Sequence, residues 1–112
     1  MTLNHIHLRI RDLKAAVDWF GTILQVQPDF RNERMAALPF GSFTVILDVG
    51  DADVPATLGF QSDDCDRDFY RVIDQGAEAI EPPANKEWGI RTAYFKGPGA
   101  LKCEIEGPVA NR

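Results

Sequence analysis

The sequence predicts an α+β domain built from two tandem units, each with the order strand, helix, strand, strand, strand. Three observations predict this fold class. A short segment with period-two alternation of apolar and polar residues opens each half of the chain. An apolar stripe at helical spacing follows each of these segments. The order of the predicted elements then repeats along the 112 residues.

The first unit opens with residues 4–10, where apolar residues alternate with His5, His7 and Arg9. This pattern is typical of a strand with one apolar and one polar face. Asp12 is a good N-cap, and the apolar spacing after it predicts a helix over about 12–25. Extended segments are then predicted over 27–31, 34–40 and 43–49, with a turn at Gly41-Ser42.

The second unit begins after the breaker-rich connector 50–55, with a predicted strand over 56–62. Asp64 is the N-cap of the second helix, and Gly76 ends that helix as a C′ glycine. A short strand over 77–80 is expected to stop at Glu81-Pro82-Pro83. The last two predicted strands cover 91–96 and 101–106 and are joined by a tight turn at Gly97-Pro98-Gly99.

The repeat can be checked by sliding the sequence along itself. A slide of 52 places Asp12 on Asp64, and a slide of 56 places Asp48 on Glu104. Copies of about 50 residues are too small to be stable alone, so we expect them to share one core. The sequence therefore predicts a single domain over 1–112, with one module over about 3–50 and a second over about 56–106.

Composition and charge narrow the classes of partner. The net charge is −5 and the pI is about 4.9, with no basic run, so neither nucleic acid nor an anionic membrane is an expected partner. The first residues do not predict a signal peptide, and no apolar run predicts a membrane span. Cys65 and Cys103 fit no metal or redox motif and are expected to be reduced, buried thiols of a cytoplasmic protein.

Two stretches of the sequence resemble a known superfamily. The opening NHIHLRIRDLKAAVDWF is similar to the first strand and helix of the vicinal-oxygen-chelate superfamily, which includes glyoxalase I, bleomycin-resistance proteins and extradiol dioxygenases. The closing GAEAIEPPANKEWGIRTAYFKGPGALKCEIE resembles its second half, so the likeness covers about residues 3–106. The resemblance implies two βαβββ modules that roll into a cup-shaped mixed sheet around a small-molecule cavity.

The resemblance also implies positions for a metal site. Metal-dependent members place a His in the first strand of a unit and a Glu in its last strand. His5 and Glu104 match these positions, and Asp48 takes the acid position of the first unit. Thr57 stands where the second histidine is expected, and Thr is a poor ligand for Zn, Ni or Fe. The expectation is therefore either no cofactor or a weakly bound divalent metal such as Mn, Fe, Ni or Zn.

His5 and Glu104 are the candidate catalytic residues. In the mechanism that the resemblance implies, a metal ion polarises the substrate and a carboxylate moves a proton. For His5, a structural role is an equal alternative, and for Glu104 the alternative is an ion pair with Arg9 or Lys102. His7 follows His5 by two positions on the same face of the predicted strand. It is a candidate for a second imidazole ligand of a metal ion, or for a contact to a bound small molecule.

Further residues are candidates for holding an organic ligand. Aromatic walls and polar or cationic anchors are the residue types that small-molecule sites use. The candidates are Arg9, Phe40, Phe43, Thr57, Trp88 and Arg91. For the charged members of this set, solvation or pairing on the surface is the alternative.

Three classes of function remain open at this point. The first is a small-molecule-binding domain with an incomplete metal site, which Thr57 favours. The second is a metal-dependent lyase, isomerase or dioxygenase acting on vicinal oxygens, which His5, Asp48 and Glu104 favour. The third is a non-catalytic regulatory or interaction domain. A homodimer is the expected assembly, because single-domain members of the superfamily commonly pair.

Overall fold

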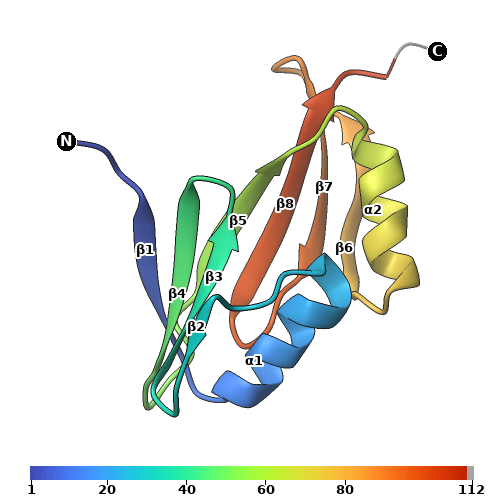
Figure 1. Ribbon diagram of the computed structural model, residues 1–112. Coiled ribbons are helices and arrows are strands. Elements are labelled where there is room, and N and C mark those ends of the chain that lie inside the picture. The colour runs from blue at the N-terminus through green and yellow to red at the C-terminus, as the bar shows by residue number, and fades with distance from the viewer. Residues whose placement is uncertain (111–112) are drawn as a thin grey trace. The chain divides into compact units, whose positions relative to one another are not determined.

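A computed structural model describes residues 1–110 and divides them into two compact units. Unit 1 comprises residues 1–55 together with 98–100, and unit 2 comprises residues 56–97 and those from 101 onward. Each unit has one four-stranded mixed sheet and helical structure on one face of it (Figure 1). Two units of the βαβββ type, in an α+β fold, are what the sequence predicts.

Unit 1 has the strand order β1-β4-β3-β2. Its elements are β1 (His5–Ile10), α1 (Leu13–Trp19), a π-helical turn η1 (Phe20–Leu24), β2 (Phe30–Arg31), β3 (Met35–Phe40) and β4 (Phe43–Val49). β1 pairs with β4 in parallel, and β3 pairs with both β2 and β4 in antiparallel fashion. Gly41, at φ 63°, begins the two-residue turn between β3 and β4, which suits a type II′ hairpin.

Unit 2 has the matching order β5-β8-β7-β6. Its elements are β5 (Ala56–Gln61), α2 (Cys65–Asp74), β6 (Ala79–Asn85), β7 (Ile90–Lys96) and β8 (Leu101–Pro108). α2 packs on β6, β7 and β8. Gly76 follows the helix with a φ of 111°, as its predicted role as C′ residue requires.

Both predicted N-caps form. The Asp12 carboxylate accepts a hydrogen bond from the backbone N–H of Ala15, and Asp64 accepts one from Arg67, each at 3.0 Å. The two caps lie 52 residues apart, so the structure confirms the slide of 52 between the two units. A cap of this type contributes about 1 kcal/mol to the stability of its helix.

The core of each unit lies between its sheet and its helix. In unit 1 the inward side chains of β1, β3 and β4 meet the apolar stripe of α1 and η1, and Phe20 and Leu47 are fully buried there. In unit 2, Phe95 and Cys103 are fully buried beneath α2. Both cysteines are free and buried, as expected. No helix within residues 1–110 is long and apolar enough to cross a membrane.

The first helix differs from the prediction in its last turn. The segment is helical to Leu24, but Phe20–Leu24 is π-helical rather than α-helical. It ends at Gln25, which adopts the left-handed conformation at φ 58°, and the Val26 N–H donates to the Phe20 carbonyl at 3.1 Å. The extended segment predicted over 27–31 is reduced to the two residues of β2.

The strand expected to stop at Glu81-Pro82-Pro83 instead runs through both prolines to Asn85. β6 is the edge strand of its sheet, and its register with β7 shifts between Ala79 and Glu81 and again between Glu81 and Ala84. Proline has no N–H to donate, and it is tolerated on an edge or at a bulge. The prediction of a stop at the prolines is therefore wrong, because an edge strand with register shifts accommodates them.

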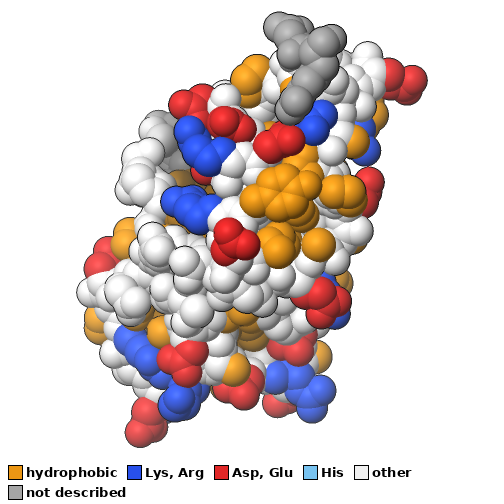
Figure 2. Space-filling view, turned by 90° about the vertical axis from the view of Figure 1, so that its right-hand side faces the viewer, with side chains coloured by type: hydrophobic (Ala, Val, Ile, Leu, Met, Phe, Trp, Pro, Cys, Tyr) orange, Lys and Arg blue, Asp and Glu red, His pale blue; other side chains and the backbone are white. Residues whose placement is uncertain are grey.

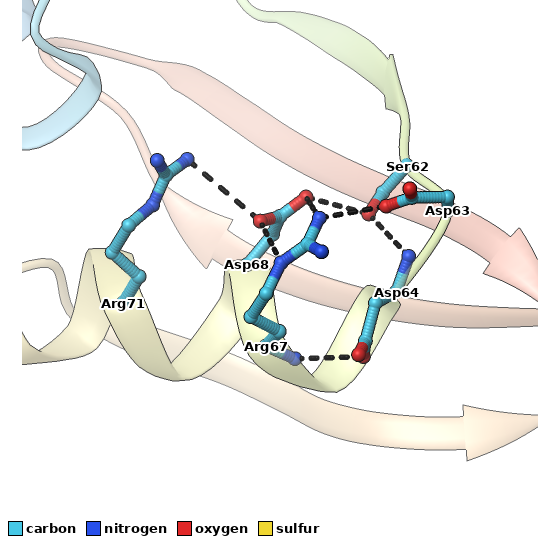
Figure 3. Close-up of polar contacts among 6 residues, drawn as sticks. All are labelled: Ser62, Asp63, Asp64, Arg67, Asp68 and Arg71. Carbon is cyan, nitrogen blue, oxygen red and sulfur yellow. Dashed lines mark hydrogen bonds and ion pairs between the residues drawn. The ribbon is translucent and has the colours of Figure 1, made fainter.

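A network of charged side chains holds the N-terminal part of α2 (Figure 3). Asp68 accepts hydrogen bonds from Ser62 and Arg67, and Arg67 also binds Asp63 at 2.7 Å. Desolvation raises the pKa of the Asp68 carboxyl, but the bonds from Arg67 and Ser62 outweigh it and hold that pKa below its usual value.

Figure 2 shows the side of the molecule that carries α2, where acidic and basic side chains surround an exposed hydrophobic patch.

Candidate functional site

The polar and charged site residues predicted in unit 1 lie on the face of its sheet opposite α1, which we call the open face of unit 1. Alternate residues of each strand point to this face, and partners in register share a face. The register places side chains there in cross-strand rows. Its members are His5, His7, Arg9, Phe30, Met35, Ala37, Pro39, Thr44, Ile46 and Asp48.

A histidine–aspartate pair stands at the β1 edge of this face. Nδ1 of His7 lies 2.7 Å from Oδ2 of Asp48, with 53% and 36% of the two side chains exposed. The two residues come from β1 and β4, which pair in parallel. Asp48 is in register with Arg9, which is two residues beyond His7. Sequence reasoning named both residues for possible ligation of a metal but did not predict their hydrogen bond.

His5 lies beside this pair and borders a shallow hollow. Its ring meets the His7 ring edge-on, with centroids 5.3 Å apart, and its Nδ1 lies 2.6 Å from Oδ1 of Asn4. The hollow has a volume of about 290 Å³ and is lined by Asn4, His5, Ser42, Thr44 and Ile46. Its lining presents hydroxyl, amide and imidazole groups, which bind the polar substituents of a small molecule.

Phe40 and Phe43 do not lie on the open face of unit 1. They face each other in the β3–β4 register on the side that faces α1, and the Phe40 ring contacts the Phe20 ring with centroids 6.2 Å apart. They therefore do not border the histidines, and their role as aromatic walls for a ligand stays a prediction. The physical reason is strand parity, which places Pro39 and Thr44 on the open face and the two phenylalanines opposite.

Arg9 does lie on the open face, as the alternation of β1 predicts. Its aliphatic part packs close to Gly50, where an added Cβ atom would lie 2.9 Å from the Arg9 Cδ. A side chain at position 50 would therefore have to displace part of the Arg9 side chain.

In unit 2, the sheet face opposite α2 carries Glu104. The Tyr94 hydroxyl donates to Oε2 of Glu104 at 2.7 Å, and Nζ of Lys102 lies 4.8 Å from the centre of the Tyr94 ring. The hydrogen bond to Glu104, desolvation and the charge of Glu104 all raise the pKa of Tyr94. Oε1 of Glu104 lies above Gly59, 3.7 Å from where a Cβ atom would stand.

Tyr94 is a site residue that the sequence reasoning missed. Tyr94 lies opposite Glu104 in the register of β7 and β8. Counting outward from the predicted turn at Gly97-Pro98-Gly99 places Tyr94 opposite Lys102 instead, so the sequence carries no local signal that pairs the phenol with the carboxylate.

The other candidates of unit 2 are dispersed. Arg91 is tied to α2 by two hydrogen bonds to the Asp66 carboxylate, at 2.6 and 3.0 Å, and these bonds raise its pKa. Thr57 is exposed and in register with Lys102. Trp88 is 64% exposed in the loop before β7. The two-bond pair gives Arg91 a structural role, whereas Thr57 and Trp88 stay candidates for ligand contact.

The register also corrects one equivalence between the units. Arg9 pairs with Asp48 in unit 1, and Gln61, 52 residues after Arg9, pairs with Glu106 in unit 2. The counterpart of Asp48 is thus Glu106, 58 residues on, and not Glu104 as the slide of 56 predicted. By the same register, the counterpart of Glu104 is Ile46, an apolar residue.

Within each unit, side chains predicted to ligate a metal ion make other contacts. Nowhere in residues 1–110 do three or more His, Cys, Asp or Glu side chains form a group arranged to hold one. In unit 1, the Nδ1 of His7 and an oxygen of Asp48 are engaged with each other. In unit 2, Glu104 stands with Thr57 and Tyr94, neither of which is a preferred ligand of Zn, Ni or Fe.

Comparison with known proteins identifies the fold. No protein-family model matches the sequence, and no curated protein matches it. A glyoxalase/bleomycin resistance protein/dioxygenase from Nocardioides superposes with a TM-score of 0.86 at 19% identity, covering 100% of this chain and 86% of that chain. A superfamily member from Sphaerobacter thermophilus gives a TM-score of 0.81 at 17% identity, over 96% of this chain and 97% of the other.

A third structure, a family enzyme from Burkholderia phytofirmans, gives a TM-score of 0.80 at 16% identity, over 97% of this chain and 100% of that chain. The chain therefore has the fold of the glyoxalase/bleomycin resistance protein/dioxygenase superfamily. This result agrees with the resemblance of the sequence to the vicinal-oxygen-chelate superfamily.

Proposed function

We propose that this chain is a small-molecule-binding domain whose ligand lies on the open face of unit 1 and needs no metal ion. The observation that supports this most is the row of side chains across β1, β4, β3 and β2. His7 is in register with Ile46, Ile46 with Ala37, and Ala37 with Phe30. One end of the row is polar and the remainder is apolar, as in sites for small organic molecules.

The hydrogen bond between His7 and Asp48 also supports a binding role. The carboxylate of Asp48 is satisfied by His7, so the face keeps its imidazole in one orientation. Ile46 and Ala37 are only partly buried, so apolar surface remains for a ligand beside the imidazole. A resident enzyme activity is not needed to account for this arrangement.

The test is a small-molecule screen followed by mapping. A panel of aromatic alcohols, acids and amides is screened by thermal shift, and hits are mapped by amide chemical-shift changes. We expect shifts concentrated at β1, β3 and β4, and loss of binding in Ile46→Glu, which places a charge in the centre of the row. Val49→Glu is the matched control, because Val49 lies on the same strand with alternate parity and is 45% exposed.

No thermal shift across the panel, or equal loss of binding in both variants, would contradict the proposal. The metal-dependent alternative is tested by metal analysis of protein purified without an affinity tag. We expect no stoichiometric transition metal, and Thr57→His is expected to increase the affinity for added Zn²⁺. Stoichiometric metal that His5→Ala and Glu104→Gln each remove would favour the metal-dependent alternative.

Homodimer formation stays a prediction. Light scattering at tens of micromolar measures it, and a particle of 12.5 kDa would contradict it.

A further inference from the structure

The hydrogen bond between His7 and Asp48 determines which ring nitrogen of His7 can accept a hydrogen bond from a ligand. With Nδ1–H donating to Asp48 at 2.7 Å, the neutral imidazole carries its lone pair on Nε2. A carboxylate behind a histidine orients the ring and selects its tautomer in this way. Half of the His7 side chain is exposed, so Nε2 is accessible to a ligand.

The groups around His7 favour a neutral O–H donor over a charged ligand. Asp48 and Arg9 carry opposite charges and are partners in the β1–β4 register, so their charges offset each other and neither sign of ligand charge is favoured beside His7. The His5 ring packs against the His7 ring in a T-shaped arrangement. A hydroxyl that donates to Nε2 needs no charge partner.

The row beside His7 determines the shape of the rest of the ligand. Ile46 and Ala37 follow His7 at successive strands, and strands lie about 4.8 Å apart, so the apolar surface extends roughly 10 Å from β1 to β3. Ala37 is small and Ile46 is partly buried, so the surface between them accepts a flat ring system. Phe30, 53% exposed, stands at the far end of the row.

From these observations we propose that unit 1 selects planar apolar alcohols, phenols and enols in their neutral form, with the hydroxyl donating to Nε2 of His7 and the ring over Ile46 and Ala37. This inference rests on the proposed function and adds to it the chemical class of ligand and the residue that discriminates. His7 is a specificity-determining residue, and Asp48 is a positioning residue that acts through it.

The experiment compares 2-naphthol with its methyl ether, 2-methoxynaphthalene, which has the same rings but no O–H donor. Binding is followed by amide chemical shifts of the full chain. We expect 2-naphthol to bind about tenfold more tightly than the ether, the effect of one well-formed hydrogen bond. His7→Phe keeps an aromatic ring but removes the acceptor, so both compounds should then bind with equal affinity.

Asp48→Ala provides a second variant in case His7→Phe does not fold. It leaves the imidazole but no longer selects its tautomer, so the preference for 2-naphthol should fall at least severalfold. Val49→Ala, on the same strand but with alternate parity, should keep the full preference.

The outcomes separate the two proposals. If the ether binds the open face as tightly as 2-naphthol, or if His7→Phe keeps the preference, the inference is overturned while small-molecule binding stands. If neither compound binds but other members of the panel do, the inference again fails alone. If nothing binds, both fail. Affinity that falls as protein concentration rises would show that a second copy of the chain covers this face, and it would overturn the inference.

Discussion

The assignment of faces in unit 1 can be tested by truncating two adjacent residues of β4. Leu47 is fully buried between Leu8 of β1 and Ala36 of β3, on the face that packs against α1. Its neighbour Ile46 is only partly buried and lies on the open face. Substitution by alanine removes a comparable volume from each side chain, so the difference in cost reports which face holds the core.

The magnitude follows from burial. Leu47→Ala leaves a cavity in a packed core and is expected to lower the free energy of unfolding by about 3 kcal/mol. Ile46→Ala removes a half-exposed side chain and should cost about 1 kcal/mol. With a urea m-value of roughly 1.5 kcal/mol/M, the midpoint should fall by about 2 M for Leu47→Ala and less than 1 M for Ile46→Ala.

The assay is urea unfolding followed by circular dichroism and tryptophan fluorescence, with the m-value compared between variants. A register slip of one residue would exchange the two faces of β4. Equal costs for the two variants, or a larger cost for Ile46→Ala, would therefore refute the assignment of His7 and Asp48 to an open face.

Three further predictions concern titratable groups. The pKa of Asp68 is lowered in the folded state, so its stabilising contribution is present above the unfolded pKa and is lost as pH falls through the folded pKa. Asp68→Asn removes this contribution and should therefore flatten the acid limb of a plot of unfolding free energy against pH, measured by urea unfolding. A flat difference between the two proteins from neutral pH into acid would contradict this. The raised pKa of Tyr94 should appear as a late step in ultraviolet titration of tyrosinate, and Glu104→Gln should move that step to lower pH; an unchanged step would show that the hydrogen bond is absent in solution. Burial raises the pKa of Cys65 to about 11 and that of Cys103 to about 12, so iodoacetamide should alkylate both slowly in the folded protein at neutral pH and rapidly in urea, as mass spectrometry will show. Rapid alkylation without denaturant would mean that these thiols are not buried.

Most of the fold could be predicted from local patterns. The alternation in β1 and in β4 gives both their faces and nearly all of their bounds, because a buried face demands period two. The caps at Asp12 and Asp64 are equally local, since a carboxylate at that position satisfies backbone N–H groups of the first turn.

The departures have non-local causes. The prolines of β6 are tolerated because that strand lies at an edge, and strand order is a property of the whole sheet. The π-helical turn at Phe20–Leu24 buries Phe20 and Ile23 in the core of unit 1. Gly21 lies in this turn, where an added Cβ atom would stand 2.8 Å from Nε2 of Gln27. Nothing in the composition of this segment distinguishes a π turn from an α turn.

The candidate site was predicted only in part for a related reason. The sequence places His5, His7 and Arg9 on one face of a strand, and the structure keeps them there. It does not specify the register between strands distant in sequence, and a two-residue difference decides whether Asp48 corresponds to Glu104 or to Glu106. Pairings such as His7 with Asp48 therefore become visible only when β1 and β4 are aligned.

The corrected register shows that the two units have diverged on the faces opposite their helices. Where unit 1 has His7, unit 2 has Gly59, and where unit 1 has Ile46, unit 2 has Glu104. Without a side chain at Gly59, the carboxylate of Glu104 lies over the β5 backbone and is held there by Tyr94. A carboxylate at this position removes the apolar centre that Ile46 provides in unit 1. The two units thus share a backbone plan but not a ligand chemistry, and an apolar ring that suits the first face would have to desolvate a hydrogen-bonded carboxylate on the second.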